Sequence, residues 1–198
     1  MKITGQCPLC VGPTRAAVLC AHCRRHLRQG HSPTDPLDPV VPVGASLITL
    51  GAFEGALRAL VLRIKHSQDT RVAQWCGHQL ARRSRGLPRP DAITYLPSQR
   101  VNRLKRGGDT AATVANALAL NTGRPLHPML SPPLGVHRRT RSGSERGKAQ
   151  GFTLISQPVG RVWLVDDVLA TGHSLRQAHD TLTAAGHRVE AWLVLARA

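Results

Sequence analysis

Two adjacent carboxylates, Asp166 and Asp167, and the small residues after them are the part of this sequence best suited to chemistry. The four residues before them, 162–165, are all apolar, which predicts a strand buried on both faces of a parallel sheet. The turn 170–174 contains hydroxyl groups and a glycine, and a helical pattern follows it. Backbone N–H groups in such a turn, with the positive end of the helix dipole, favour an anion such as phosphate.

The carboxylates need a separate explanation, because two negative charges beside a phosphate site would repel the phosphate. They suit a ribose diol, which donates hydrogen bonds to them, or a hydrated Mg²⁺ that offsets the phosphate charge. A sugar site beside a 5′-phosphate site describes a phosphoribosyl group. The alternative is an Asp-Asp pair that merely ends a strand.

The order of strand, two acidic residues and Thr/Gly-rich loop resembles the signature with which type I phosphoribosyltransferases bind phosphoribosyl pyrophosphate (PRPP). Ala170 stands where that signature commonly has Thr, and Ser174 also replaces a usual Thr. The resemblance implies that Asp166 and Asp167 are catalytic and grip the ribose hydroxyls, with Mg²⁺ on the pyrophosphate. It also implies a PRPP-binding loop made of Val168, Leu169, Ala170, Thr171, Gly172, His173 and Ser174.

Four cysteines near the N-terminus form two C-x-x-C pairs, Cys7 with Cys10 and Cys20 with Cys23. Four thiolates in this pairing suit tetrahedral Zn²⁺, in a closed structural site with no position for water. Disulfides are the competing interpretation, which a cytoplasmic location disfavours. The fifth cysteine, Cys76, lies in a helical pattern and is expected to be a small buried apolar residue.

The charge balance predicts a polyanionic partner. Lys and Arg number 27 against 11 Asp and Glu, a net charge of +16, and nucleic acid is the commonest partner of so basic a protein. The alternative is a solvated surface in an arginine-rich proteome. Aromatic residues make up only 3%, too few for a base-stacking platform, so nucleic-acid contacts would be directed at phosphates.

Hydropathy gives no sign of membrane insertion. The hydrophobic content of 41% is typical of a globular protein, and no apolar run approaches the ~20 residues that span a bilayer. The first residues lack the apolar core of a signal peptide, so a cytoplasmic location is expected.

Two basic loops follow predicted strands. The loop 97–106 contains Arg100, Arg103 and Arg106, which we expect to contact the phosphates of PRPP. The loop 131–150 has no hydrophobic period, and a polar loop this long in a compact domain is usually functional or disordered. We expect it to bind nucleic acid through Arg138, Arg139 and Arg141.

The elements around these loops alternate between strand and helix. Helices are predicted over 53–66, 70–85 and 109–123, the last with Asp109 as N-cap and Gly123 as its end, and a fourth follows residue 174. Strands are predicted over 43–50, 91–96, 125–130, 162–165 and 189–195. This alternation predicts an α/β fold, a type I phosphoribosyltransferase-like parallel sheet flanked by helices. Ligands of such sheets bind beyond the carboxyl ends of the strands, where the three loops should converge.

Prolines and glycine between residues 30 and 42 divide the chain. We predict a four-cysteine zinc module over 1–30, a linker over 31–45 and a phosphoribosyltransferase-like domain over 46–198.

This combination resembles the ComF family of competence proteins, including its GntX-like members. The likeness rests on the four cysteines, the helix segment 55–65, Pro97 with Arg106-Gly107, and Ala196-Arg197. Gly108 and Asp109 replace the family's usual aromatic and Asn, and the segment 140–152 is shorter than its counterpart. The resemblance implies a cytoplasmic role in natural transformation, with incoming single-stranded DNA, a PRPP-type ligand and other DNA-uptake proteins as partners.

The sequence leaves a second function open, an active Mg²⁺-dependent phosphoribosyltransferase that uses PRPP. No acceptor site is identified for that reaction, because only one strand follows the helix after the loop. A third interpretation is a zinc-stabilised domain whose phosphoribosyl site has lost its activity.

Overall fold

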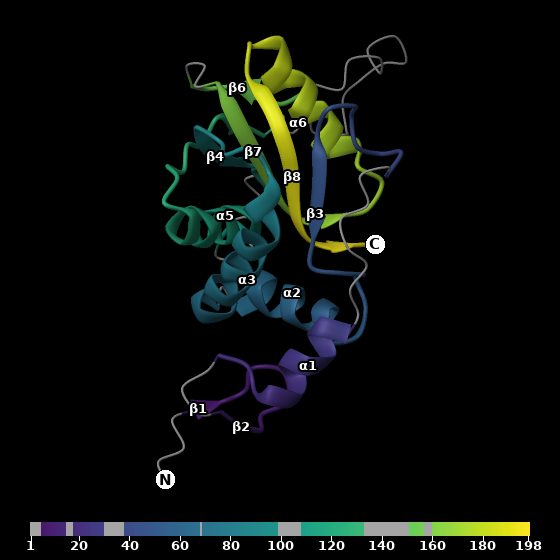
Figure 1. Ribbon diagram of the computed structural model, residues 1–198, viewed down its shortest axis with the longest axis vertical. Coiled ribbons are helices and arrows are strands. Elements are labelled where there is room, and N and C mark those ends of the chain that lie inside the picture. The colour runs from purple at the N-terminus through teal and green to yellow at the C-terminus, as the bar shows by residue number, and fades with distance from the viewer. Residues whose placement is uncertain are drawn as a thin grey trace, which may run out of the picture.

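A computed structural model describes residues 5–14, 18–29, 38–67, 69–98, 108–132, 151–156 and 160–198 of the chain (Figure 1). The N-terminal module consists of β1 (Gly5–Gln6), β2 (Pro13–Thr14) and α1 (Ala21–Gln29). The larger part contains strands and helices in the order β3 (Ser46–Thr49), α2 (Gly55–Ser67), α3 (Thr70–Arg83), η1 (Ser84–Gly86), β4 (Ala92–Tyr95), α5 (Thr110–Thr122), β5 (Leu130–Ser131), β6 (Thr153–Leu154), β7 (Arg161–Leu169), α6 (His173–Ala184) and β8 (Arg188–Arg197).

Four of these strands form a parallel sheet in the order β3-β8-β7-β4. The two longest strands, β7 and β8, lie at its centre, and their apolar residues are buried almost throughout. Alternate residues of these strands enter two separate hydrophobic clusters, one on each face of the sheet. The predicted fold class, a parallel sheet flanked by helices, is therefore confirmed.

Helices cover both faces of the sheet, as Figure 1 shows. The cluster on one face joins α2, α3 and α5 to the sheet, and the cluster on the other face joins α6 to it. The packing of α3 on α5 is unusually close, because a Cβ on Gly77 would come within 2.6 Å of the backbone of Ala117. The small side chains of α5 allow this approach.

Local signals in the sequence place both ends of α5 correctly. Asp109 caps α5 and accepts a hydrogen bond from the N–H of Ala112, and Gly123 ends the helix in the left-handed conformation. Asp69 caps α3 in the same way. Asp109 and Gly123 were predictable because each bonds or ends its own helix within a few positions of itself, whereas the cap at Asp69 was not predicted.

Two strand predictions need correction. The strand predicted over 162–165 continues to Leu169, so Asp166 and Asp167 lie inside β7 and do not end it. The segment 125–130 contributes to the main sheet only an isolated bridge between Leu126 and Ile93. Prolines at 125 and 128 remove ladder donors there, so only β5 forms, and it pairs antiparallel with β6.

The N-terminal module packs against the rest of the protein. Leu19 and Leu27 belong to the same buried cluster as α2 and α3, and α1 lies beside α2 (Figure 1). The division into a zinc module, a linker and a domain stays a prediction. Within the described part of the chain, no helix is both long and apolar enough to span a bilayer.

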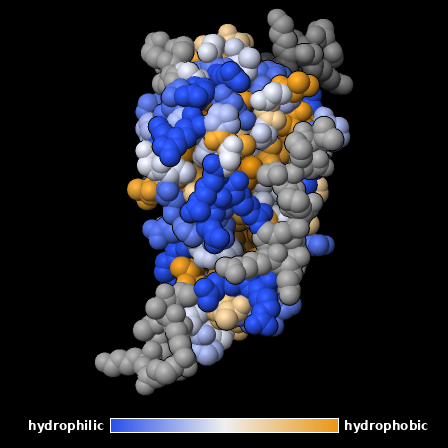
Figure 2. Space-filling model, in the orientation of Figure 1, coloured by the Kyte–Doolittle hydropathy of each residue, from blue (hydrophilic) through white to orange (hydrophobic). Residues whose placement is uncertain are grey.

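The surface agrees with the composition. The face seen in Figure 2 is mainly hydrophilic, with apolar side chains in small separate areas. The large apolar side chains that are exposed, among the described residues, are Val11, Val43, Leu120 and Ile155, which lie far apart in the sequence.

Candidate functional site

The two carboxylates lie near the carboxyl end of β7, at the centre of the sheet. The register of β7 against β8 runs without a shift from Trp163 to Leu169, through both carboxylates. Val165 and Val168 contact the same hydrophobic cluster, whereas strict alternation of side chains would put them on opposite faces. The backbone N–H of Asp167 donates to Asp166 Oδ1 at 2.7 Å. The carboxylates therefore lie between apolar residues of a strand whose pairing with β8 is continuous.

Asp166 lies in a setting that disfavours its charge. Burial raises the pKa of its carboxyl well above the ordinary value, and the negative charges of Asp167 and Asp109 raise it further. The hydrogen bond from Asp167 N and the positive charge of Lys65 act in the opposite direction without reversing the shift. A perturbed carboxyl at the end of a parallel strand is typical of functional sites.

Asp109 contributes the third carboxylate and is fixed by hydrogen bonds. The N–H of Ser98, just after β4, donates to Asp109 Oδ2 at 2.8 Å, and the hydroxyl of Ser98 lies 3.4 Å from Oδ1. The sequence predicted Asp109 only as a helix cap. Its electrostatic effect on Asp166 depends on the neighbouring positions of β4 and β7 in the sheet, which no local pattern reveals.

Lys65, near the end of α2, supplies the counter-charge. Its Nζ lies 3.2 Å from Asp167 Oδ2, and the two side chains are 25% and 18% exposed. The sequence placed Lys65 off the apolar face of its helix without assigning it a partner. Three carboxylates and one ammonium group therefore meet at this edge of the sheet.

The loop after β7 presents backbone donors to solvent. Its exposed members are Ala170, Thr171, His173 and Ser174. The hydroxyl of Thr171 lies 3.5 Å from the N–H of His173, whereas the N–H groups of Thr171 and Ser174 have no acceptor among the described residues. Free N–H groups at the start of α6 suit an anion.

Gly172 fixes the shape of this loop. It adopts the left-handed conformation with φ of 74°, and a Cβ at this position would overlap Cγ1 of Val40. Glycine is the residue that fits both constraints. Segment 38–41, part of the predicted linker, thus lies directly against the loop.

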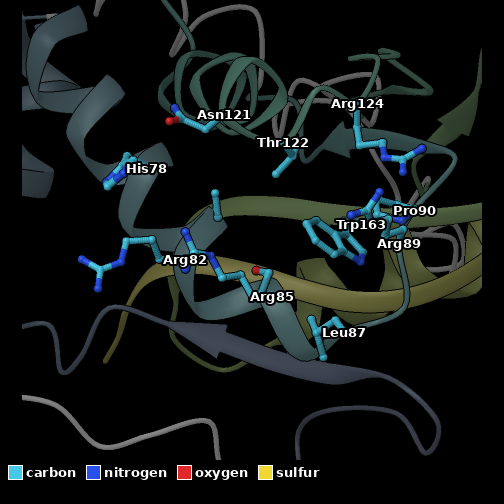
Figure 3. Close-up of a pocket in the computed structure, with 12 residues that line it drawn as sticks. His78, Arg82, Arg85, Leu87, Arg89, Pro90, Asn121, Thr122, Arg124 and Trp163 are labelled. Carbon is cyan, nitrogen blue, oxygen red and sulfur yellow. The ribbon is translucent and has the colours of Figure 1, made fainter.

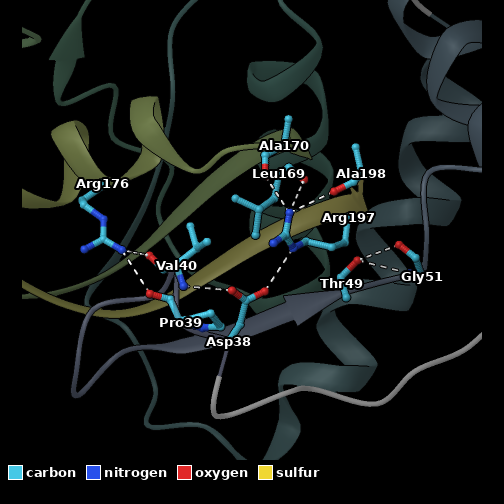
Figure 4. A network of polar contacts seen from close by, with 10 residues as sticks. All are labelled: Asp38, Pro39, Val40, Thr49, Gly51, Leu169, Ala170, Arg176, Arg197 and Ala198. Carbon is cyan, nitrogen blue, oxygen red and sulfur yellow. Dashed lines mark hydrogen bonds and ion pairs between the residues drawn. The ribbon is translucent and has the colours of Figure 1, made fainter.

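Two arginines hold segment 38–41 in place, as Figure 4 shows. Arg176 of α6 donates to the carbonyl oxygens of Pro39 and Val40, the latter at 2.6 Å. Arg197 Nε pairs with Asp38 Oδ2 at 3.0 Å, and its Nη1 donates to Ala170 O at 2.6 Å. Arg197 therefore links the loop, the last strand and this segment.

The four predicted zinc ligands converge. Their sulfur atoms all lie within 4.8 Å of one another, close to the ~3.8 Å separation of thiolates around a tetrahedral Zn²⁺. Cys23 N donates to the sulfur of Cys20, and all four cysteines are free of disulfides. Burial acts to raise the pKa of Cys7, but hydrogen bonds outweigh it and lower the pKa to about 6, whereas burial and the neighbouring thiols raise the pKa of Cys23. The cluster fits a metal ion.

Six predicted site residues lie outside the described residues. They are the arginines of the two basic loops, Arg100, Arg103, Arg106, Arg138, Arg139 and Arg141. Their part in binding phosphate or nucleic acid stays a prediction.

Carboxylate oxygens are hard ligands that coordinate Mg²⁺, and they accept hydrogen bonds from ribose hydroxyls. A cation or a pair of hydroxyl donors at Asp166 would offset the repulsion that raises its pKa. The donor set at the end of β7 therefore fits a hydrated Mg²⁺ or a sugar diol, next to a loop that fits a phosphate.

Comparison with known proteins gives structural matches only. No protein-family model matches the chain, and no curated protein matches its sequence. The allosteric regulatory enzyme of purine biosynthesis matches at 22% identity over 62% of this chain, with a TM-score of 0.44, and this match spans only 25% of that enzyme.

Two adenine phosphoribosyltransferases also match. The enzyme from Thermoanaerobacter pseudethanolicus is 17% identical, and the match covers 67% of this chain and 83% of the enzyme, with a TM-score of 0.45. The enzyme from Leishmania tarentolae is 14% identical, and the match covers 83% of this chain and 94% of the enzyme, with a TM-score of 0.46.

Proposed function

We propose that this protein binds a 5-phosphoribosyl ligand of the PRPP type, with Mg²⁺, at the carboxyl end of its central strand. The observation that carries the proposal is one continuous stretch of chain. Asp166 and Asp167 lie in β7 near its carboxyl end, and the exposed loop with free N–H groups begins three residues after Asp167. Carboxylates for the ribose hydroxyls and donors for the 5′-phosphate are thereby next to each other.

Each group has a defined part in binding. The loop N–H groups and the hydroxyls of Thr171 and Ser174 donate to the 5′-phosphate, and the dipole of α6 adds positive potential. Asp166 and Asp167 accept hydrogen bonds from the ribose hydroxyls. Mg²⁺, when bound, neutralises the pyrophosphate charge that would otherwise meet the carboxylates. Lys65 keeps Asp167 in position and limits the negative charge of the site.

We further propose that this site serves natural transformation, with single-stranded DNA on the cytoplasmic side as the partner. The support is the resemblance of the sequence to ComF proteins and the net charge of +16. The basic loops would neutralise phosphates without reading the bases, so binding should weaken steeply with salt. A 5′-phosphorylated strand end carries the same phosphoribosyl chemistry as PRPP.

One observation favours the alternative, an active phosphoribosyltransferase. Burial and the charge of Asp167 raise the pKa of Asp166, and carboxyls with raised pKa values are found among the general acids and bases of enzymes. Transfer would break the bond between ribose C1 and pyrophosphate, with Asp166 and Asp167 stabilising the positive charge on the sugar. The acceptor that would attack C1 is not identified.

Calorimetry with PRPP and Mg²⁺ tests the binding proposal. We expect the variant Asp166→Asn/Asp167→Asn to bind PRPP at least about tenfold more weakly, because it loses charge-assisted hydrogen bonds to the ligand. Asp180→Asn, an exposed change of the same kind on α6, is the matched control and should bind normally. Equal PRPP affinity in the double variant and the wild type would refute the proposal.

Two further titrations separate the roles. If the DNA proposal is right, a short 5′-phosphorylated single strand should bind and lose affinity as salt rises, and failure to bind near physiological salt contradicts it. Release of pyrophosphate from PRPP in the presence of an acceptor base would establish the transferase. PRPP binding without turnover by any nucleobase would leave a binding protein.

A further inference from the structure

A basic cavity lies at the opposite end of the sheet from the Asp pair. Its volume is about 330 Å³, within the range of small-ligand pockets. The wall comes from the end of α3, the turn that leads into β4, the end of α5 and the start of β7, as Figure 3 shows. All these segments lie at the amino ends of the parallel strands. The cavity is therefore separate from the site proposed above.

Four arginines line this cavity: Arg82, Arg85, Arg89 and Arg124. None of their guanidinium groups forms an ion pair or a hydrogen bond within the described ranges. The nearest carboxylate in sequence, Asp91, is already bonded to Arg161 and does not line the cavity. Four guanidinium groups without a counter-charge create a positive potential that attracts anions.

Exposed arginines alone would be an ordinary solvated surface, but the cavity also contains a buried donor. Trp163 is only 4% exposed, and its indole Nε1 has no hydrogen-bond acceptor among the described residues. A buried N–H without a partner is costly and rare in folded proteins. An indole N–H can only donate, so the group that would satisfy it is an acceptor. The arginines that line the same cavity are also donors, so they too would bind an acceptor group.

The part of the cavity wall without arginines indicates which kind of molecule carries the acceptor group. Ala81, Leu87 and Pro90 give the cavity an apolar side next to the arginines, and His78 and Asn121 lie at its rim. A phosphate group joined to a sugar or base matches this division between a cationic and an apolar wall. Guanidinium groups bind phosphate oxygens in pairs, which adds geometric selectivity over a simple anion.

We propose that this cavity is a second binding site, which takes a nucleotide phosphate between the four arginines and Trp163 Nε1. The long exposed side chains of Arg82, Arg85 and Arg89 can close on the phosphate and bring an oxygen within reach of the indole. The phosphate belongs either to a free mononucleotide or to a strand of nucleic acid. The site does not depend on PRPP binding at the other end of the sheet.

Calorimetry with three probes tests this site: pyrophosphate, adenosine monophosphate and a single-stranded oligothymidylate of about ten residues. The Asp166→Asn/Asp167→Asn variant serves as background, so that binding at the first site is weakened. On that background, Arg85→Gln/Arg89→Gln should raise the Kd at least about tenfold. Trp163→Phe keeps an aromatic ring and should raise the Kd ~threefold. Arg71→Gln, an exposed arginine at the other end of α3, should leave the Kd unchanged.

The pattern of probes identifies the source of the phosphate. Binding of adenosine monophosphate that depends on Arg85 and Arg89 identifies a free nucleotide. Binding of the oligothymidylate alone, with the same dependence, identifies nucleic acid. Ligand-dependent quenching of tryptophan fluorescence that disappears in Trp163→Phe but persists in Trp75→Phe would report contact at the indole. The proposal is overturned if no probe binds, or if the Arg85→Gln/Arg89→Gln variant binds every probe as its background does.

Discussion

Lys65 Nζ and Asp167 Oδ2 lie 3.2 Å apart, and this ion pair connects the end of α2 to the strand that carries the Asp pair. The two residues are separated by more than a hundred positions in the sequence. Their contact places a positive charge beside Asp166, Asp167 and Asp109, which otherwise repel one another. The pair both stabilises the site and limits its affinity for cations.

Lys65→Met should therefore change stability and metal binding in opposite directions. Loss of the ammonium group leaves three carboxylates together, and we expect the free energy of unfolding to fall by about 1–2 kcal/mol. The affinity for Mg²⁺ should rise, because the site becomes more negative. Denaturant unfolding and Mg²⁺ calorimetry measure the two effects. Lys65→Met/Asp167→Asn should lose less stability than the sum of its single changes, and strict additivity would show that the pair has no energetic role.

The stability of the protein should also depend on Asp166 through pH. Burial and the neighbouring negative charges hold the pKa of its carboxyl well above the ordinary value of about 3.9 in the unfolded chain. Such a group stabilises the fold fully below the unfolded pKa, and the contribution is lost as the pH rises through the folded pKa. At neutral pH, Asp166 therefore lowers the free energy of unfolding relative to its value at low pH.

Asp166→Asn should remove that penalty. The amide oxygen still accepts from Asp167 N, and we expect the free energy of unfolding at pH 7 to rise by on the order of 1 kcal/mol while PRPP binds more weakly. The gain should shrink on acidification towards pH 4. Urea unfolding of both proteins across this pH range measures it. A variant that is less stable than the wild type at pH 7 would mean that the charge of Asp166 is favourable in the fold.

The comparison between sequence and structure separates local signals from distant ones. The caps Asp109 and Gly123 were predictable because each acts on its own helix. The end of β7 was not, because a carboxylate normally disfavours a buried strand, and here a distant lysine and a neighbouring backbone donor compensate for it. The residue types alone predicted that the strand ends before Asp166, and contacts made in the folded protein allow it to continue to Leu169.

Segment 38–41 gives the second instance. Its prolines predicted a linker, yet it packs on the phosphate loop through its backbone carbonyls, which bond to Arg176. Contacts made by backbone atoms leave no trace in residue types, so the sequence could not indicate this one. The four cysteines, by contrast, were recognisable because metal geometry restricts both their type and their spacing.

The contact between Gly172 and Val40 leads to a third prediction. Gly172→Ala introduces a Cβ in the left-handed region, which costs about 1 kcal/mol, and the overlap with Val40 adds about 1–3 kcal/mol. PRPP affinity should fall as well, since the loop must shift. Gly44→Ala is the matched control, because Gly44 has φ of 90° and no atom near a Cβ, and it should lose only the first amount.

A double variant divides the two costs at Gly172. Val40→Ala/Gly172→Ala should recover the loss due to overlap and keep the loss due to φ. Chemical denaturation of the four proteins supplies the free energies. If Gly172→Ala is no worse than Gly44→Ala, the packing of segment 38–41 against the loop does not constrain this position.

The cysteine cluster yields the last prediction. Cys10→Ser should reduce bound zinc from about one equivalent to near zero and lower the Tm, because the three remaining thiolates bind Zn²⁺ much more weakly. Cys10 is exposed, so the loss of stability would not come from a lost core contact. The effect should reach α2, since Leu19 and Leu27 share its hydrophobic cluster. Metal analysis and thermal unfolding, with and without a chelator, measure these effects.

Cys76 is a buried cysteine outside the cluster, so the Cys76→Ala variant is the control and should bind as much zinc as the wild type. A wild-type protein whose Tm responds to reductant but not to chelator would establish the disulfide interpretation instead.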